Sequence, residues 1–144
     1  MKHAHRISWI LFGLLAVIYI ALSLLSVVHS YVNPSGDLIA GRFTPAEVAN
    51  GDEAVAAALS ARRGTAAAFG LGYGILLLGA VLAYRKERRA FGWIVAASLV
   101  NAGVVLLRIP FLGVTHGLAG GTFPLIIILI ATALGLVDRH RAAA

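Results

Sequence analysis

Four long apolar stretches alternate with short polar segments along the chain. The stretches cover about residues 7–29, 65–84, 90–107 and 118–137, and none of them contains an Asp, Glu, Lys or Arg. Each is near the ~20 residues that an α-helix needs to cross about 30 Å of hydrocarbon. The pattern therefore predicts an all-α integral membrane protein, in which residues 1–144 form a single transmembrane domain.

The segment at residues 85–89, with the sequence RKERR, determines how these spans are oriented. It separates the second span from the third, and it must lie outside the bilayer because a cation inside the hydrocarbon is costly. An excess of Arg and Lys is typical of cytoplasmic segments. We therefore predict an antiparallel four-helix transmembrane bundle with its N- and C-termini in the cytoplasm.

The distribution of the other charges supports this orientation. The cations of the predicted cytoplasmic segments are Lys2, Arg6, Arg85, Lys86, Arg88, Arg89, Arg139 and Arg141. The cations predicted to lie outside are Arg42, Arg62, Arg63 and Arg108, and they are balanced by Asp37, Glu47, Asp52 and Glu53. The net charge of +6 therefore falls on the cytoplasmic side, as the positive-inside rule requires. Because the cations flank apolar spans, they indicate a multi-pass protein of the inner (plasma) membrane and not a nucleic-acid-binding protein.

The first outer loop, residues 30–64, is predicted to carry two short helices on the outer membrane surface. The pattern TPAE at residues 44–47 is that of a capping box with Pro at the first helical position. Asp52 is expected to cap a second short helix that ends before the second span. These helices are interpreted as a cap over the bundle or as a surface for a partner. Residues 111–121 are predicted to form the second outer loop, after a break at Pro110.

Small and polar residues inside the spans predict where helices pack. Gly70 and Gly74 form a G-x-x-x-G pair in the second span, and such pairs let helix backbones approach closely. The pair predicts either tight packing within the chain or the seam of a homo-oligomer. Asn101 lies near the middle of the third span and is expected to bond to a backbone carbonyl or to a Ser of a neighbouring helix.

The composition excludes several kinds of membrane enzyme and transporter. The chain has no cysteine, so thiol–quinone oxidoreductase chemistry is absent. The spans contain no carboxylate, which disfavours a proton-coupled exporter. The scattered acids of the outer loop do not form the cluster that a metal-dependent phosphate enzyme needs. We therefore predict no catalytic residue, no metal site and no enzymatic activity.

Three polar residues are expected at similar depth near the outer interface. His29 ends the first span, Arg108 ends the third, and His116 precedes the fourth. Arg108 has the chemistry to hold a lipid phosphate or a carboxylate. The two imidazoles suit axial haem ligation, or a divalent metal together with Asp37 or Glu47. The alternatives are that the histidines bond to water or backbone, and that Arg108 pairs with Asp37 or Glu47 as an outer clasp.

Three motifs connect the chain with a known group of proteins. They are Asn33-Pro34, the sequence FGLGYG at residues 69–74, and RKERR at residues 85–89. Together with the four spans and the helical first outer loop, they resemble small bacterial DoxX-like membrane proteins over most of the chain. The resemblance implies an accessory role beside a redox enzyme, or a group without an established role, and it transfers no catalytic residue. Members of the group often carry a polar or acidic residue in a span, whereas the spans here hold no acid.

The predicted function is that of a small, non-catalytic structural or accessory subunit of the inner membrane. It would pack against a larger membrane protein or against further copies of itself. The resemblance to DoxX-like proteins implies that the larger partner is a redox enzyme. The alternative is a four-helix module that binds a lipid, a quinone or haem in the bilayer. A small transporter is a third reading, and the charge-free spans disfavour it.

The topology is testable with reporter fusions. Fusions after Glu87 and at the C-terminus are expected to report the cytoplasm, and a fusion at Asn50 is expected to report the outside, because the cations gather at the cytoplasmic ends of the spans. A periplasmic signal from the Glu87 fusion would invert the whole assignment.

Overall fold

The chain folds into long helices. The computed structural model describes residues 2–34, 41–119 and 122–143, and every regular element in these ranges is a helix. The helices are α1 (Lys2–Val32), α3 (Pro45–Ala49), α4 (Glu53–Tyr84), α5 (Ala90–Ala119) and α6 (Thr122–Ala143). Helices α1, α4, α5 and α6 are long and apolar enough to cross a membrane, which confirms the prediction of four apolar spans.

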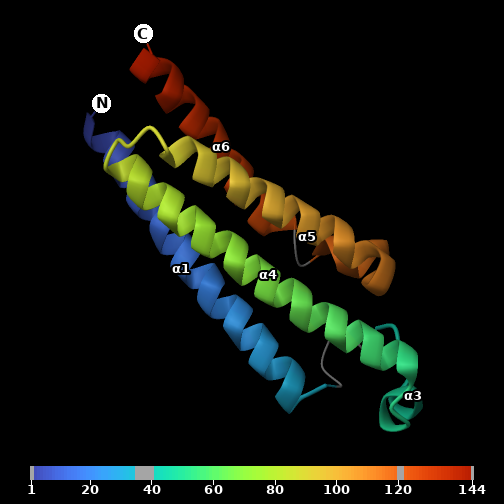
Figure 1. Ribbon diagram of the computed structural model, residues 1–144. Coiled ribbons are helices and arrows are strands. Elements are labelled where there is room, and N and C mark those ends of the chain that lie inside the picture. Colours follow the sequence, from blue (N-terminus) through green and yellow to red (C-terminus); the bar gives the residue numbers. More distant parts are fainter. Residues whose placement is uncertain (1, 35–40, 120–121, 144) are drawn as a thin grey trace.

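The four long helices pack in the order of the chain. Helix α1 packs on α4, α4 on α5, and α5 on α6. The N- and C-termini lie at one end of the molecule together with the α4–α5 turn, and α3 lies at the other end (Figure 1). Large apolar side chains such as Leu24, Leu99 and Leu106 are more than 60% exposed, as suits helices that face lipid instead of water.

Helix α4 is longer than the sequence pattern predicts. The expected short helix after Asp52 and the second span form one unbroken helix of 32 residues. Asp52 does cap it, because its carboxylate accepts a hydrogen bond from the backbone N–H of Ala54 at 3.1 Å. Gly64 does not interrupt it, since a glycine inside a helix costs only about 1 kcal/mol. The prediction of a separate second surface helix is therefore wrong, whereas α3 and its Thr44–Glu47 capping box are present.

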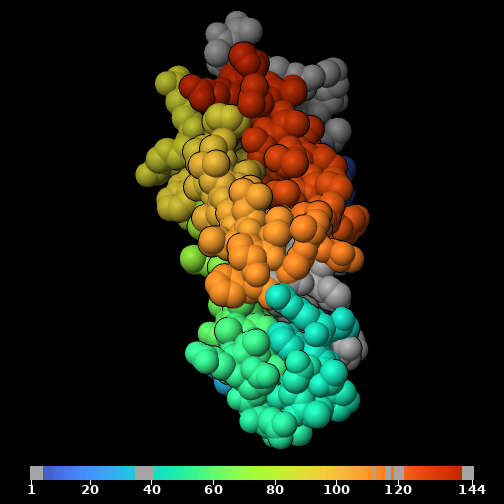
Figure 2. Space-filling view, turned by 90° about the vertical axis from the view of Figure 1, so that its right-hand side faces the viewer, coloured from blue at the N-terminus to red at the C-terminus, as the bar shows by residue number. Residues whose placement is uncertain are grey.

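The α3 end of the molecule extends past the ends of α5 and α6. Figure 2 shows α3 and the first turns of α4 as a mass beyond the kinked end of α5. Two arginines hold it in place. Arg63 on α4 donates to the hydroxyl of the buried Ser30 at 3.1 Å and to its carbonyl at 3.0 Å, and Arg42 donates to the carbonyl of Phe111. Arg63 thus satisfies the C-terminal end of α1, where a cation also complements the helix dipole.

Helix α5 continues beyond the predicted break at Pro110. Pro110 lies inside the helix, and the non-helical backbone is at Gly113, where φ is 76°. A proline removes one backbone hydrogen bond and strains the preceding turn, and a glycine tolerates a positive φ. The first helical stretch therefore ends near Gly113, about one turn after the predicted break, and a second helical stretch follows it to Ala119, so much of the predicted loop 111–121 is helical.

Polar bonds connect the helices where the chain ends meet. Asp138 on α6 accepts a hydrogen bond from the indole N–H of Trp9 at 3.0 Å and lies 3.0 Å from Nδ1 of His5. Further along the bundle, the hydroxyls of Ser98 on α5 and Thr132 on α6 are 2.6 Å apart. Trp9 is only 2% exposed, so the carboxylate satisfies a donor that would otherwise be buried without a partner.

Helices α4 and α5 approach each other closely at Gly72 and Gly79. A Cβ atom at Gly72 would lie 2.2 Å from Nδ2 of Asn101, and one at Gly79 would lie 2.8 Å from Ile94. Asn101 is fully buried and donates from Nδ2 to the carbonyl of Ala97, on its own helix, at 2.8 Å. At Gly74 an added Cβ would meet nothing within 4 Å. Close packing of α4 on α5 therefore uses Gly72 and Gly79, and Gly70 packs near Ser23 of α1. A Cβ at Gly74 would point into space that the described residues leave open.

This difference gives a matched pair of variants. Gly72→Ala is expected to lower the stability of the bundle by about 1–3 kcal/mol, because the new methyl group collides with the buried Asn101 amide. Gly74→Ala is expected to be neutral or slightly stabilising, since alanine favours a helix more than glycine does. Thermal unfolding in a mild detergent measures both. Equal melting temperatures for the two variants would show that Asn101 moves aside freely.

Candidate functional site

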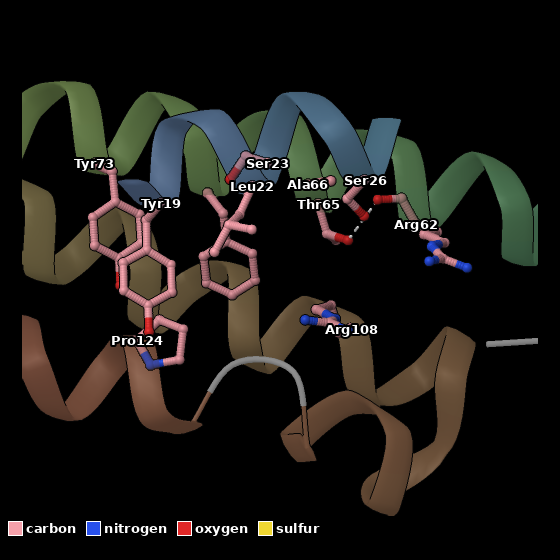
Figure 3. Close-up of a pocket in the computed structure, with 11 residues that line it drawn as sticks. Tyr19, Leu22, Ser23, Ser26, Arg62, Thr65, Ala66, Tyr73, Arg108 and Pro124 are labelled. Atoms are coloured by element: carbon pink, nitrogen blue, oxygen red, sulfur yellow. Dashed lines mark hydrogen bonds between the residues drawn. The ribbon is translucent and has the colours of Figure 1, made fainter. Parts of the chain in front are cut away.

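A cavity of about 330 Å³ lies between the four long helices, in the half of the bundle nearer α3. Its walls come from every span (Figure 3). The lining residues are Tyr19, Leu22, Ser23 and Ser26 from α1, Arg62, Thr65, Ala66, Phe69 and Tyr73 from α4, Arg108 from α5, and Pro124 from α6. No carboxylate and no histidine occurs among these described lining residues. The described lining therefore carries two cationic side chains, those of Arg62 and Arg108.

Helical periodicity explains why these residues share one cavity. On α4, residues 62, 65, 66, 69 and 73 follow steps of three or four, and on α1 residues 19, 22, 23 and 26 do the same. Residues at this spacing lie on one face of a helix. Between Arg62 and Tyr73 the face extends for roughly 16 Å at a rise of about 1.5 Å per residue. The site thus depends on α4 being continuous, because a break at Gly64 would place Arg62 elsewhere.

Two arginines form the end of the cavity nearer α3. Arg62 descends from α4 and Arg108 from α5, on the side away from the tyrosines (Figure 3). Arg108 is only 8% exposed, and its guanidinium lies over the ring of Phe69 at 5.6 Å. Nη1 of Arg62 is buried and has no hydrogen-bond partner within the described residues.

Two tyrosines form the opposite, inner end of the cavity. The rings of Tyr19 and Tyr73 stack with their centroids 4.6 Å apart and their planes at 12°, and they extend side by side toward Pro124 (Figure 3). Tyr73 is 1% exposed, and its hydroxyl has no hydrogen-bond partner in the part of the chain that the structure describes. Buried tyrosine hydroxyls usually find a partner. The inner end thus offers a flat aromatic surface and one buried donor.

Short hydroxyl side chains lie between the two ends. Ser23, Ser26 and Thr65 line the cavity, and Thr65 donates its hydroxyl proton to the carbonyl of Arg62 at 3.1 Å. Ser23 also packs near Gly70, where an added Cβ would lie 3.3 Å from the serine Cβ. The lining of the cavity therefore changes along its length, from cationic side chains at one end, through hydroxyl groups, to aromatic rings at the other.

The structure brings only one of the three predicted ligand residues into this cavity. Arg108 lines it, whereas His29 is exposed on the last turn of α1 and is not among the lining residues. The side chain of His116 lies outside the described residues, so its predicted proximity to Arg108 stays a prediction. In the described part of the chain no group of three or more His, Asp or Glu residues is placed to hold a metal ion. The cavity residues themselves do not fit a divalent cation, because their charges are positive.

The predicted outer clasp of Arg108 has two possible carboxylates. Glu47 accepts hydrogen bonds from the backbone N–H of Thr44 at 2.6 Å and from its hydroxyl at 2.8 Å. These bonds, the backbone one first, hold the pKa of Glu47 below its usual value. Glu47 is thus engaged in capping α3. Asp37 lies outside the described residues, and its pairing with Arg108 stays a prediction.

Reasoning from the sequence did not identify Arg62, Tyr19 or Tyr73 as site residues. Arg62 was assigned with Arg63 to the end of a short surface helix, where both would complement the dipole. The signal for Arg62 is its helical spacing from Phe69 and Tyr73, which is meaningful only if α4 passes through Gly64. The signal for the tyrosines is weaker, since tyrosines inside spans are common packing residues.

Comparison of the chain with protein-family models, with curated proteins and with solved structures gives no match. The resemblance to DoxX-like proteins therefore stays a prediction, and the assignment of function depends on the cavity.

Proposed function

We propose that this protein is a four-span protein of the inner membrane that binds an amphiphilic molecule between its helices. The observation that carries the proposal is the cavity itself, which is lined by all four spans, cationic at one end and aromatic at the other. Ligand pockets are mostly apolar with a few convergent polar groups. Such a gradient, inside a bundle surrounded by lipid, suits a molecule with a polar head and an apolar body.

The proposed topology is an antiparallel bundle with both termini in the cytoplasm. Two features support it. The cations gather in the N-terminal segment, the α4–α5 turn and the C-terminal segment, and these three segments lie at one end of the molecule (Figure 1). By this topology the cavity opens in the outer leaflet, close to the outer interface where lipid headgroups lie.

Binding is testable by filling the cavity with a side chain. Leu22 on α1 lines the cavity and is 51% exposed, whereas Leu24 on the same helix is 63% exposed and is not among the lining residues. Leu22→Trp is expected to lower the amount of co-purifying amphiphile several-fold, because the indole occupies the cavity. Leu24→Trp is expected to retain the wild-type amount. Native mass spectrometry of protein released from mild detergent measures both.

The binding proposal has a clear contrary outcome. If the wild-type protein carries no bound molecule under these conditions, or if the two tryptophan variants retain equal amounts, then the cavity is only a gap in the packing. A ligand that the Leu22→Trp variant alone loses would support the proposal, whatever the chemical identity of that ligand.

A second candidate is an accessory subunit, which one observation favours. An added Cβ at Gly74 on α4 would meet nothing within 4 Å in the described chain, and the neighbouring Leu71 and Leu78 are 64% and 41% exposed. Small residues on an open face of a span permit close approach by another helix. In this role the protein is a non-catalytic partner of a larger membrane protein or of further copies of itself.

The accessory role predicts an effect of a large side chain at Gly74. Gly74→Leu is expected to abolish association with a co-purifying membrane protein or a second copy while leaving the melting temperature of the single chain unchanged, because the new side chain points away from the bundle. Size-exclusion chromatography with light scattering checks the oligomeric state, and mass spectrometry identifies a hetero-partner. Unaltered assembly in Gly74→Leu would show that this face contacts lipid only.

A further inference from the structure

We infer that the bound amphiphile carries an uncharged carbonyl oxygen at its inner end, and that the hydroxyl group of Tyr73 donates a hydrogen bond to it. This inference rests on the proposed binding function and deepens it, because it names the chemical group that the cavity selects and the residue that selects it.

The hydroxyl group of Tyr73 is a buried donor without an acceptor. Tyr73 lines the cavity and is 1% exposed, and its hydroxyl has no hydrogen-bond partner in the described part of the chain. Buried polar groups are usually hydrogen-bonded, because an unpaired one costs folding free energy. Since the described lining supplies no acceptor, the acceptor comes from the contents of the cavity, which are either a ligand or water.

The ring of Tyr73 is held in one orientation. It stacks on the ring of Tyr19 from α1, with the centroids 4.6 Å apart, and both rings extend from their helices toward Pro124 (Figure 3). The preceding residue on α4, Gly72, packs so closely on α5 that an added Cβ would lie 2.2 Å from the side-chain amide nitrogen of Asn101. This contact fixes the rotation of α4. The hydroxyl is therefore preorganised, and a ligand that bonds to it orders little that was free before.

The neighbouring helix α5 does not supply the missing acceptor. Oδ1 of Asn101 is itself buried without a partner in the described chain, so it is not bonded to Tyr73. Asn101 meets α4 at Gly72, and one residue along an α-helix corresponds to a rotation of about 100°. Asn101 is also not among the residues that line the cavity. The donor of Tyr73 thus stays available to a ligand.

The depth of Tyr73 favours an uncharged acceptor. Tyr73 lies in the middle of the apolar stretch 65–84, roughly 12 Å along α4 from Thr65 at a rise of about 1.5 Å per residue. A charged oxygen is costly at this depth. A carbonyl oxygen is uncharged and accepts hydrogen bonds. It also brings no donor of its own, whereas a ligand hydroxyl or amide would bring one that needs a further acceptor.

Two classes of membrane molecule provide such an oxygen. One is a quinone, whose flat ring also suits a wall made of aromatic side chains. The other is a glycerolipid, whose ester groups carry carbonyl oxygens. Both classes share the group that Tyr73 is inferred to recognise, and matched probes distinguish them.

The inference is testable with pairs of probes that differ in the carbonyl group. Delipidated wild-type protein in mild detergent is titrated by native mass spectrometry with a decyl-tailed benzoquinone and with decylbenzene, and then with a diacylglycerol and with its dialkyl ether. In the pair that resembles the natural ligand, we expect the carbonyl compound to bind about tenfold more tightly, because it gains a hydrogen bond to a fixed donor. The pair that shows this difference assigns the source of the carbonyl.

A conservative variant locates the donor. Tyr73→Phe removes the hydroxyl and keeps the ring, so it is expected to weaken the carbonyl compound by about tenfold and to leave its carbonyl-free partner unchanged. Tyr84→Phe makes the same change on the same helix, at a residue that is 40% exposed and does not line the cavity, and it is expected to discriminate as the wild type does. Because the two probes are compared within one variant, a general loss of stability cannot imitate the result.

The hydrogen bond also has a spectroscopic signature. With an isotope label on the carbonyl carbon of the tighter probe, the infrared stretching band of the bound carbonyl is expected at lower frequency in the wild type than in Tyr73→Phe. An equal frequency in the two proteins would show that the carbonyl does not bond to Tyr73.

Two binding results would overturn the inference. They are equal affinities within both pairs for the wild type, and undiminished discrimination in Tyr73→Phe; in either case water is the partner of the hydroxyl. If Leu22→Trp still releases an amphiphile, the binding function stands and only the carbonyl assignment fails. A wild-type protein that carries no ligand and binds none of these probes would contradict the binding function itself.

Discussion

The bundle depends on the direct packing of α4 against both α1 and α5. Lipid supplies no hydrophobic force that drives one span onto another, so association relies on van der Waals contact and a few polar bonds. Gly72 and Gly79 provide the contact with α5, because their missing side chains leave room for Asn101 and Ile94. Arg63 provides a bond to the end of α1. If α4 were broken or displaced, α1 would lose the helix against which it mainly packs.

The same helix also explains the polar cavity. Its face from Arg62 to Tyr73 points between the other spans, and the kinked α5 brings Arg108 to the same end. A bundle selected only for stability would not need two cations there, since polar and ionisable groups in a membrane are expensive and mark functional sites.

The two ends of the bundle are held in different ways. At the end with the termini, Asp138 connects α6 to Trp9 and His5 of α1. At the α3 end, Arg63 and Arg42 connect the extended part of α4 and the preceding segment to α1 and α5. Between them α1 and α6 have few direct contacts. Among the described residues, the polar bonds between α1 and α6 thus lie at the end with the termini.

The sequence by itself determined the number of spans, the class of the fold and the capping residues Thr44 and Asp52, because apolar length and local hydrogen bonding are properties of short segments. It also indicated Arg108 as a polar residue near the outer interface. Only the tertiary structure decided that α4 runs through Gly64, that Gly72 and not Gly74 approaches α5, and that Arg62 shares a cavity with Arg108. These features depend on which face of each helix meets its neighbour, that is, on the rotation of each helix about its own axis. Because lipid and the protein interior are equally apolar, an apolar span does not by itself determine this rotation.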